Sequence, residues 1–192
     1  MARVALLDPS ESADPAVREF APKVTKPDGS VGGHFGAESH FPEVMMPVYE
    51  ARLALARKGD LGNRLFTKVA VATSMANECA YCVGAYSGQL SRQLGGDEAV
   101  HRFQRSVRAG DLEGKERDVV AFAQSLIRDP QGLTDADFEH VREDHGFTDP
   151  TFVELIYVVN VVSGYNRLTV SLDLEYDHDY PEAWAREAAG LP

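Results

Sequence analysis

Apolar positions in this chain recur mainly at the three- and four-residue spacing of amphipathic helices, and alternating strand-like runs are scarce. Glycine, proline and short polar residues separate the apolar segments and mark where helices begin and end. In chain order, the pattern predicts a short N-terminal helix and then helices over 42–58, 61–76, 78–94, 97–107, 113–128, 135–145 and 149–172. We therefore expect an all-α, single-domain helical bundle of about seven or eight helices.

Several predicted helix starts carry a capping residue. Asp60 and Asn77 are each expected to accept a hydrogen bond from the first turn of the helix that follows. Thr134 and Asp137 have the spacing of a capping box, with Asp in place of Glu. Pro150 lies just inside the start of the last long helix. Because that helix is apolar on most faces, we expect it to lie at the centre of the bundle.

Two segments fall outside this helical pattern. Residues 26–37 are rich in glycine and predict a flexible surface loop after the N-terminal helix, with a lid over a site as the alternative. Residues 175–192 form a C-terminal tail after the helical domain of residues 1–174. Trp184 and the alanine-rich end of this tail are candidates for contact with a neighbouring subunit.

Composition and charge narrow the function. The 192 residues suit one domain, and 44% hydrophobic with 26% charged residues is ordinary for a globular protein. A net charge of −11 argues against binding to nucleic acid or to anionic membrane surfaces. The N-terminal apolar run is too short for a signal peptide, and the apolar stretch over 152–162 is interrupted by Glu154 and Asn160. These features predict a cytoplasmic protein.

The chain has only two cysteines, Cys79 and Cys82, in a Cys-x-x-Cys motif at a predicted helix start. In a reducing compartment such a pair is usually catalytic, redox-sensing or metal-bound. Reversible dithiol chemistry is the leading interpretation. A pair of buried small apolar residues is an alternative, and so is a zinc site that takes both cysteines from each of two chains.

The reactive form of a cysteine is the thiolate, so a working pair needs a lowered pKa. A helix N-terminus stabilises negative charge, and Cys79 is expected to feel this effect most. The neighbouring Glu78 carboxylate opposes it, and Cys82 lies one turn deeper, where the helix dipole has faded.

The segment 68–87 around the motif resembles the carboxymuconolactone decarboxylase / alkylhydroperoxidase D-like family. An apolar helix is followed there by Asn-x-Cys-x-Tyr-Cys, a small residue and an aromatic position. Further similarities lie in Arg3–Asp8, in Ser39-His40-Phe41-Pro42, and in the Asn160 and Tyr165-Asn166-Arg167 positions of the last helix. The resemblance extends from about Arg3 to Leu174 and is most specific over 67–90.

The peroxidase branch of that family implies an all-helical, usually oligomeric protein that reduces hydroperoxides with its two cysteines. By this resemblance Cys82 attacks the peroxide and Cys79 resolves the product. The branch also has a proton relay of a glutamate twelve residues before the first cysteine and a histidine four after the second. Here those positions hold Thr67 and Tyr86, so both relay groups are missing. We expect weak peroxidase activity in which Thr67 and Tyr86 tune the site by hydrogen bonds.

The resemblance implies no metal, haem or flavin, and a lipoyl-type or thioredoxin-type dithiol as the reductant that regenerates the protein. The decarboxylase branch typically lacks the Cys-x-x-Cys motif, which disfavours lactone decarboxylation. Two other classes stay open. One is a cofactor-free lyase or isomerase acting in the same pocket, and the other is a non-enzymatic redox sensor.

The chain has six histidines that could replace the missing base or bind a metal. His140 and His145 are five residues apart and do not share a helical face, which disfavours a metal site. His34, His101 and His178 are expected to be solvated or at the surface, with a partner contact or cation binding as the alternatives for the segment around His178. His40 is a packing residue or a residue near the pocket.

Asn160, Ser163 and Arg167 fall near one stripe of the apolar last helix. They predict hydrogen bonds between helices or across a subunit interface, with pocket lining as the alternative.

Overall fold

A computed structural model describes residues 2–192. Within that range it contains ten α-helices, three 3₁₀ turns and no strand, only an isolated bridge between Thr25 and Val31. The α-helices are α1 Pro15–Phe20, α2 Gly33–Glu38, α3 Pro42–Lys58, α4 Gly62–Ala76, α5 Ala80–Leu94, α6 Asp97–Ala109, α7 Gly114–Arg128, α8 Asp135–His145, α9 Asp149–Ser171 and α10 Glu182–Ala188. The all-α prediction is confirmed. The seven longer helices α3 to α9 and the short N-terminal helix α1 correspond to the predicted ones, and α2 and α10 are short additional helices.

Most predicted boundaries agree with the structure because they depend on local signals. Helix α3 has the predicted bounds, and the capping box of Thr134 and Asp137 is present at the start of α8. The start of α4 differs from prediction. Leu61, not Asp60, is its N-cap, and the Glu154 carboxylate of α9 accepts hydrogen bonds from the backbone N–H groups of Asp60 and Leu61. A side chain from another helix therefore satisfies these amides.

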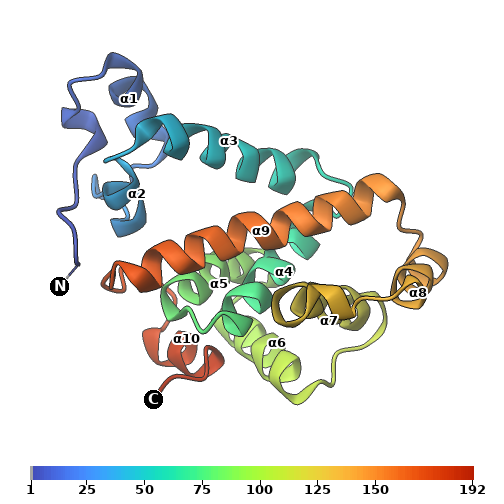
Figure 1. The fold of residues 1–192 in the computed structure, drawn as a ribbon. Helices are drawn as coiled ribbons and strands as arrows, with labels where there is room; N and C mark the ends of the chain where they lie inside the picture. The colour runs from blue at the N-terminus through green and yellow to red at the C-terminus, as the bar shows by residue number, and fades with distance from the viewer. Residues whose placement is uncertain (1) are drawn as a thin grey trace.

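Helices α4, α5, α7 and α9 share the main apolar core, and α9 lies between the N-terminal helices and the remaining bundle (Figure 1). Every residue of α4 from Phe66 to Met75 is buried, which makes α4 the most enclosed helix of the described chain. Helix α9 packs against α3, α4, α5 and α7, as its apolar sequence predicts. No helix within residues 2–192 is long and apolar enough to cross a membrane.

The N-terminal helices have a small core of their own, separate from the main one. It consists of Phe20, Val24, Met45 and Tyr49. Figure 1 shows α1, α2 and the start of α3 beside the end of α9, away from α6 and α7. The N-terminal region is therefore an arm that packs on α9 and α4 through α2 and α3.

The structure changes the interpretation of both irregular segments. The glycine-rich stretch 26–37 contains most of α2, and Gly33, Gly36 and Ala37 of that helix are buried. The prediction of a plain surface loop was therefore wrong for this part. The tail folds back so that α10 packs on α5 and α6, and Trp184 stacks on the His101 ring of the same chain with 4.4 Å between centroids.

Candidate active site

The two cysteines lie at the turn that joins α4 to α5. Cys79 is the N-cap residue of α5, and its Sγ accepts a hydrogen bond from the backbone N–H of Cys82 at 3.3 Å. Glu78 takes a left-handed backbone conformation with φ of 54°, which closes the turn after α4. Asn77, predicted to be the N-cap, instead points its amide at α9. The prediction was wrong about the cap because that amide has two partners on the neighbouring helix.

Thr169 of α9 contacts both sulfurs. Its Oγ1 lies 3.1 Å from Cys79 Sγ and 3.4 Å from Cys82 Sγ. The same hydroxyl is also within hydrogen-bonding distance of the backbone carbonyls of Tyr165 and Asn166. Both cysteines are free thiols and are buried. A single hydroxyl on the central helix therefore contacts both sulfurs of the motif.

The surroundings of the two thiols shift their pKa values in opposite directions. The hydrogen bond from the Cys82 thiol, joined by those from Thr169, the Cys82 N–H and Asn166, lowers the pKa of Cys79 to about 7 despite its burial. Burial and the neighbouring Cys79 sulfur raise the pKa of Cys82 well above its ordinary value. When the reduced pair loses one proton, Cys79 therefore gives it up and Cys82 keeps its own.

A buried amide network fixes the turn to α9. The Asn77 side-chain N–H group donates to Asn166 Oδ1 at 2.9 Å and to Ser163 Oγ at 3.0 Å. Asn166 Nδ2 in turn donates to Ser74 Oγ on α4 at 3.1 Å. These bonds join α4 and α9 beside Cys79. They therefore hold its sulfur close to Thr169, one of the groups that lower its pKa.

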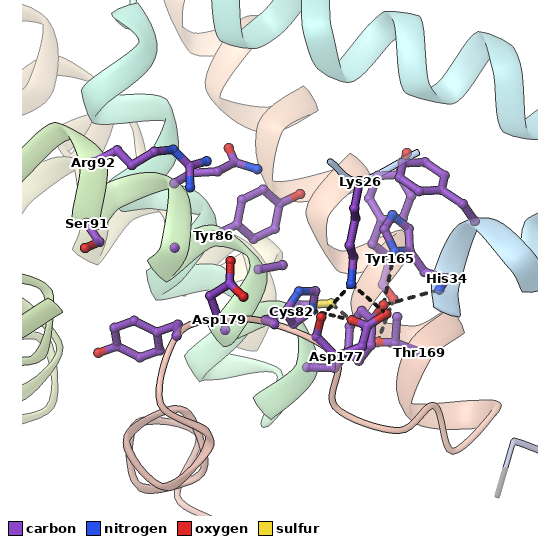
Figure 2. A pocket seen from close by; sticks show the side chains of 18 of the residues that line it. Lys26, His34, Cys82, Tyr86, Ser91, Arg92, Tyr165, Thr169, Asp177 and Asp179 are labelled. Atoms are coloured by element: carbon purple, nitrogen blue, oxygen red, sulfur yellow. Dashed lines mark hydrogen bonds and ion pairs between the residues drawn. The ribbon is translucent and has the colours of Figure 1, made fainter. Parts of the chain in front are cut away.

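A cavity of about 780 Å³ opens beside Cys82. Figure 2 shows Cys82 and Tyr86 on one side of this space, with Lys26 and Tyr165 on another. Cys79 is not among the lining residues, so Cys82 is the sulfur that a molecule in the cavity meets. The N-terminal arm, α5, α9 and the tail segment after α9 all contribute to the wall.

A polar cluster closes one end of the cavity by joining segments far apart in the chain. Asp177 Oδ2 accepts the Gly33 N–H at 2.8 Å and lies 3.4 Å from Lys26 Nζ. Tyr81, which precedes Cys82, donates to Asp177 and lies 3.3 Å from His34 Nδ1. Burial lowers the pKa of His34 to about 3, so this ring is neutral near pH 7. The predictions of solvated positions for His34 and His178 were wrong, since both line the cavity.

The two relay positions differ in their surroundings. Tyr86 lines the cavity, is buried, and has a raised pKa because of that burial, so its hydroxyl is a hydrogen-bond donor and not a base. Thr67 is fully buried in α4, donates to the Asn63 carbonyl at 2.7 Å and accepts from Gln93 at 3.1 Å. Thr67 is not among the residues that line the cavity, and these two bonds connect α4 internally and to α5.

The other histidines lie away from the cavity. His40 is exposed at the carbonyl of Ala5, and His101 packs against Trp184. His140 and His145 both approach one oxygen of Asp118, at 3.3 and 2.7 Å. Across residues 2–192, no group of three or more His, Cys, Asp or Glu side chains has the arrangement of a metal site.

Part of the polar stripe predicted on the last helix joins the site. Ser163 takes part in the amide network, whereas Asn160 and Arg167 are exposed. Asn166 and Thr169 were missed as site residues. A threonine and an asparagine buried within so apolar a helix were the available signal, because buried polar groups need partners.

Comparison with known proteins agrees with this architecture. The sequence matches no family model and no curated protein. Among solved structures, a peroxidase-related protein from Ralstonia eutropha JMP134, described as an alkylhydroperoxidase AhpD core, superposes with a TM-score of 0.80 at 22% identity over 96% of each chain. A peroxidase-related protein from Silicibacter sp. TM1040 gives 0.79 at 20% identity over 93% of each chain. The debrominase Bmp8, crystallised as a cysteine-to-alanine variant with 2,3,4-tribromopyrrole, gives 0.72 at 16% identity over 96% of each chain.

Proposed function

We propose that this chain, which has the alkylhydroperoxidase D-like fold, is a dithiol peroxidase that reduces organic hydroperoxides through Cys82 and Cys79. The observation that carries the proposal is the pairing of two buried thiols of opposite pKa shift, one of which faces a cavity of about 780 Å³. A cysteine pair used only for packing would need neither the hydrogen bonds to its sulfurs nor access from a cavity.

The reaction divides between the two sulfurs. The Cys82 thiolate attacks the terminal oxygen of the hydroperoxide, the O–O bond breaks, and the alkoxide leaves and takes up a proton as the alcohol. Cys82 is then a sulfenic acid. Cys79 attacks it, the S–S bond forms and water leaves. One hydroperoxide is reduced by two electrons to an alcohol and water, and the two thiols are oxidised to a disulfide.

Cys79 also takes the place of the missing relay base. In the singly ionised pair the proton lies on Cys82 and the charge on Cys79, with a hydrogen bond between them. When Cys82 attacks, its proton passes to the Cys79 sulfur, which leaves a reactive Cys82 thiolate and a Cys79 thiol. Thr169 contacts both sulfurs and can stabilise whichever carries the charge. Tyr86 is in position to donate to the departing alkoxide.

Regeneration requires a dithiol, and the lipoyl or thioredoxin type fits because exchange with a protein disulfide needs two thiols in sequence. We also include assembly into a homo-oligomer in the proposal. Helix α9 exposes Val153, Tyr157 and Val170, which are 52, 58 and 54% exposed, and such residues commonly face a partner chain. Sedimentation of the protein with and without Tyr157→Glu would test the assembly.

The direct test is to mix reduced protein with a slight excess of cumene hydroperoxide at neutral pH and quench at timed intervals. We expect both thiols to be lost within seconds, with a mass decrease of two hydrogens per chain. Cys82→Ser should abolish this reaction, whereas Cys79→Ser should let Cys82 accumulate as a sulfenic acid that dimedone traps. Thiols that persist for many minutes in the unmodified protein would refute peroxidase activity.

Reductive dehalogenation is a second candidate, favoured by the likeness to the debrominase and by the aromatic wall of the cavity. Two thiols supply the two electrons that convert an aryl bromide and a proton to the arene and bromide, again leaving a disulfide. Incubation of the reduced protein with a brominated pyrrole and detection of bromide by ion chromatography distinguishes this activity from peroxide reduction.

A further inference from the structure

We infer that Arg52 binds an anionic group of the substrate, so that the cavity accepts an organic hydroperoxide with an apolar body and a carboxylate. This inference rests on the proposed function and specifies its substrate class. Arg52 lies on α3 of the N-terminal arm, far in sequence from the cysteines, and its side chain lines the same cavity as Cys82.

The guanidinium of Arg52 has no anionic partner. Arg52 is partly buried, yet within residues 2–192 it forms no ion pair within 4.0 Å. Two of its neighbours are aromatic, since it lies over the Tyr49 ring, 5.3 Å from the centroid, and beside the Tyr165 hydroxyl. A cation withdrawn from water without a counter-ion is costly, and a ligand carboxylate would supply the missing partner.

Glu38 is the one internal carboxyl that competes for this role. Its Oε2 is buried without a hydrogen-bond partner, at the end of α2, and it is within electrostatic range of Arg52. However, burial raises the pKa of Glu38 to about 7, so near neutrality this group carries only part of a charge. Glu38 therefore leaves Arg52 without a fully charged counter-ion, and a ligand anion can supply one.

The other cations of the cavity wall suit this role less well. Lys26 is bound to Asp177 through both its carboxylate and its backbone carbonyl. Arg92 is exposed at the end of α5, so water already solvates its charge. Arg52 is thus the cation of the cavity that combines partial burial with the lack of an acidic partner.

The wall near Arg52 suits an apolar substrate body. The rings of Phe35, Tyr81, Tyr86 and Tyr165 line the cavity together with Cys82. Aromatic rings favour flat or branched apolar groups, which they contact edge-on or face-on. A substrate held by its anion at Arg52 would lay its apolar part along these rings and extend its hydroperoxide toward Cys82.

The test compares two ligands that differ only in charge. The hydroperoxide of 4-isopropylbenzoic acid carries a carboxylate, and the hydroperoxide of its methyl ester does not. Their alcohol products give a binding measurement by titration calorimetry that requires no turnover. Arg52→Gln removes the charge and Arg52→Lys retains it. Arg57→Gln removes the same charge from an exposed position of the same helix and is the matched control.

We expect the carboxylate product to bind at least about tenfold more tightly than the ester, as one charged hydrogen bond provides. Arg52→Gln should abolish this preference, Arg52→Lys should retain part of it, and Arg57→Gln should retain it fully. Equal binding of acid and ester, binding of neither, or a preference that survives Arg52→Gln would overturn the inference. Reduction of both hydroperoxides at equal kcat/KM would leave the peroxidase proposal standing and reject the substrate class. If binding depends on Arg52 but neither hydroperoxide is reduced, the anion site stands and the peroxidase proposal is rejected.

Discussion

Replacement of Thr169 by valine removes the hydroxyl that contacts both sulfurs and keeps the shape of the side chain. The hydrogen bonds around Cys79, opposed by its burial, give a net lowering of its pKa from the ordinary 9.0 to about 7. This difference corresponds to about 2.7 kcal/mol, at about 1.36 kcal/mol for each pKa unit. Thr169 is one of four donors to this sulfur, after the Cys82 thiol and together with the Cys82 N–H and Asn166.

The share of Thr169 is limited by competition for its one hydrogen. The hydroxyl is also 3.0 Å from the Tyr165 carbonyl and 3.1 Å from the Asn166 carbonyl, so it leaves one of these to donate to a thiolate. We therefore assign it about 1.4 kcal/mol, near the lower end for a hydrogen bond to a charged group. Thr169→Val should then raise the pKa of Cys79 by about 1. At pH 7 the thiolate fraction of Cys79 would then fall about fivefold, from about one half to about one tenth.

The assay is the ultraviolet thiolate absorbance of the reduced protein between pH 5 and 10, which reports ionisation of a buried thiol without a reagent having to reach the sulfur. Thr73→Val is the matched control, since Thr73 is buried in α4 and its hydroxyl has no hydrogen-bond partner within residues 2–192. The control should leave the pKa of the thiol pair unchanged. An unchanged pKa in Thr169→Val as well would refute the reasoning, because it would mean that the hydroxyl stays on the helix carbonyls and never stabilises the thiolate.

Three further predictions concern stability, each measured by urea unfolding. Thr73→Val should raise the free energy of unfolding by about 1 kcal/mol, because it removes a buried hydroxyl without a partner; a loss of stability would indicate a bond to bound water. Asp118→Asn should lower it by about 1 kcal/mol at pH 7, since Asp118 bonds Arg117 and His145 and these bonds lower the pKa of its carboxyl. Because its pKa is lower in the folded state, the ionised carboxyl stabilises the fold at pH values above its unfolded-state pKa of about 4. The stability difference between the two proteins should therefore shrink below pH 4, and a difference that stays constant with pH would contradict the assignment. Gly84→Ala should cost about 1–3 kcal/mol, because an added Cβ would lie 2.1 Å from the Tyr176 hydroxyl oxygen; wild-type stability would show that the ring moves freely.

The helices were predictable because their boundaries depend on residues next to them in the sequence. Gly95 and Gly146 end α5 and α8 with left-handed backbone, as glycine after an amphipathic run indicates. The start of α5 was not predictable in this way. Asn77 has the stronger capping preference, but its amide bonds Ser163 and Asn166 on α9, and the cap passes to Cys79. Here tertiary contacts outweigh local preference.

The cavity wall was hardest to predict because its parts are joined across most of the chain. The Gly33 N–H and the Asp177 carboxylate are 144 positions apart, and neither segment has a periodic pattern. Short polar or glycine-rich stretches predict solvated loops on composition alone, as was expected for His34 and His178. Thr67 differs from these residues, because it was a candidate only through the family resemblance. In the structure it lies in α4, and its hydrogen bonds to Asn63 and from Gln93 do not involve the sulfurs.

The site is divided between two parts of the molecule, so variants in the two parts should change different properties. The thiol pair is held by α4, α5 and α9, and no hydrogen bond reaches either sulfur from residues 2–58. The N-terminal arm supplies Arg52 to the cavity and has its own small core. Arg52→Gln should therefore change ligand preference without moving the thiol pKa, and Thr169→Val should do the opposite. If Arg52→Gln moved the pKa of the pair as far as Thr169→Val does, the arm would act on the sulfurs themselves. If each variant changes only its own property, substrate choice can vary through the arm while the redox pair keeps its chemistry.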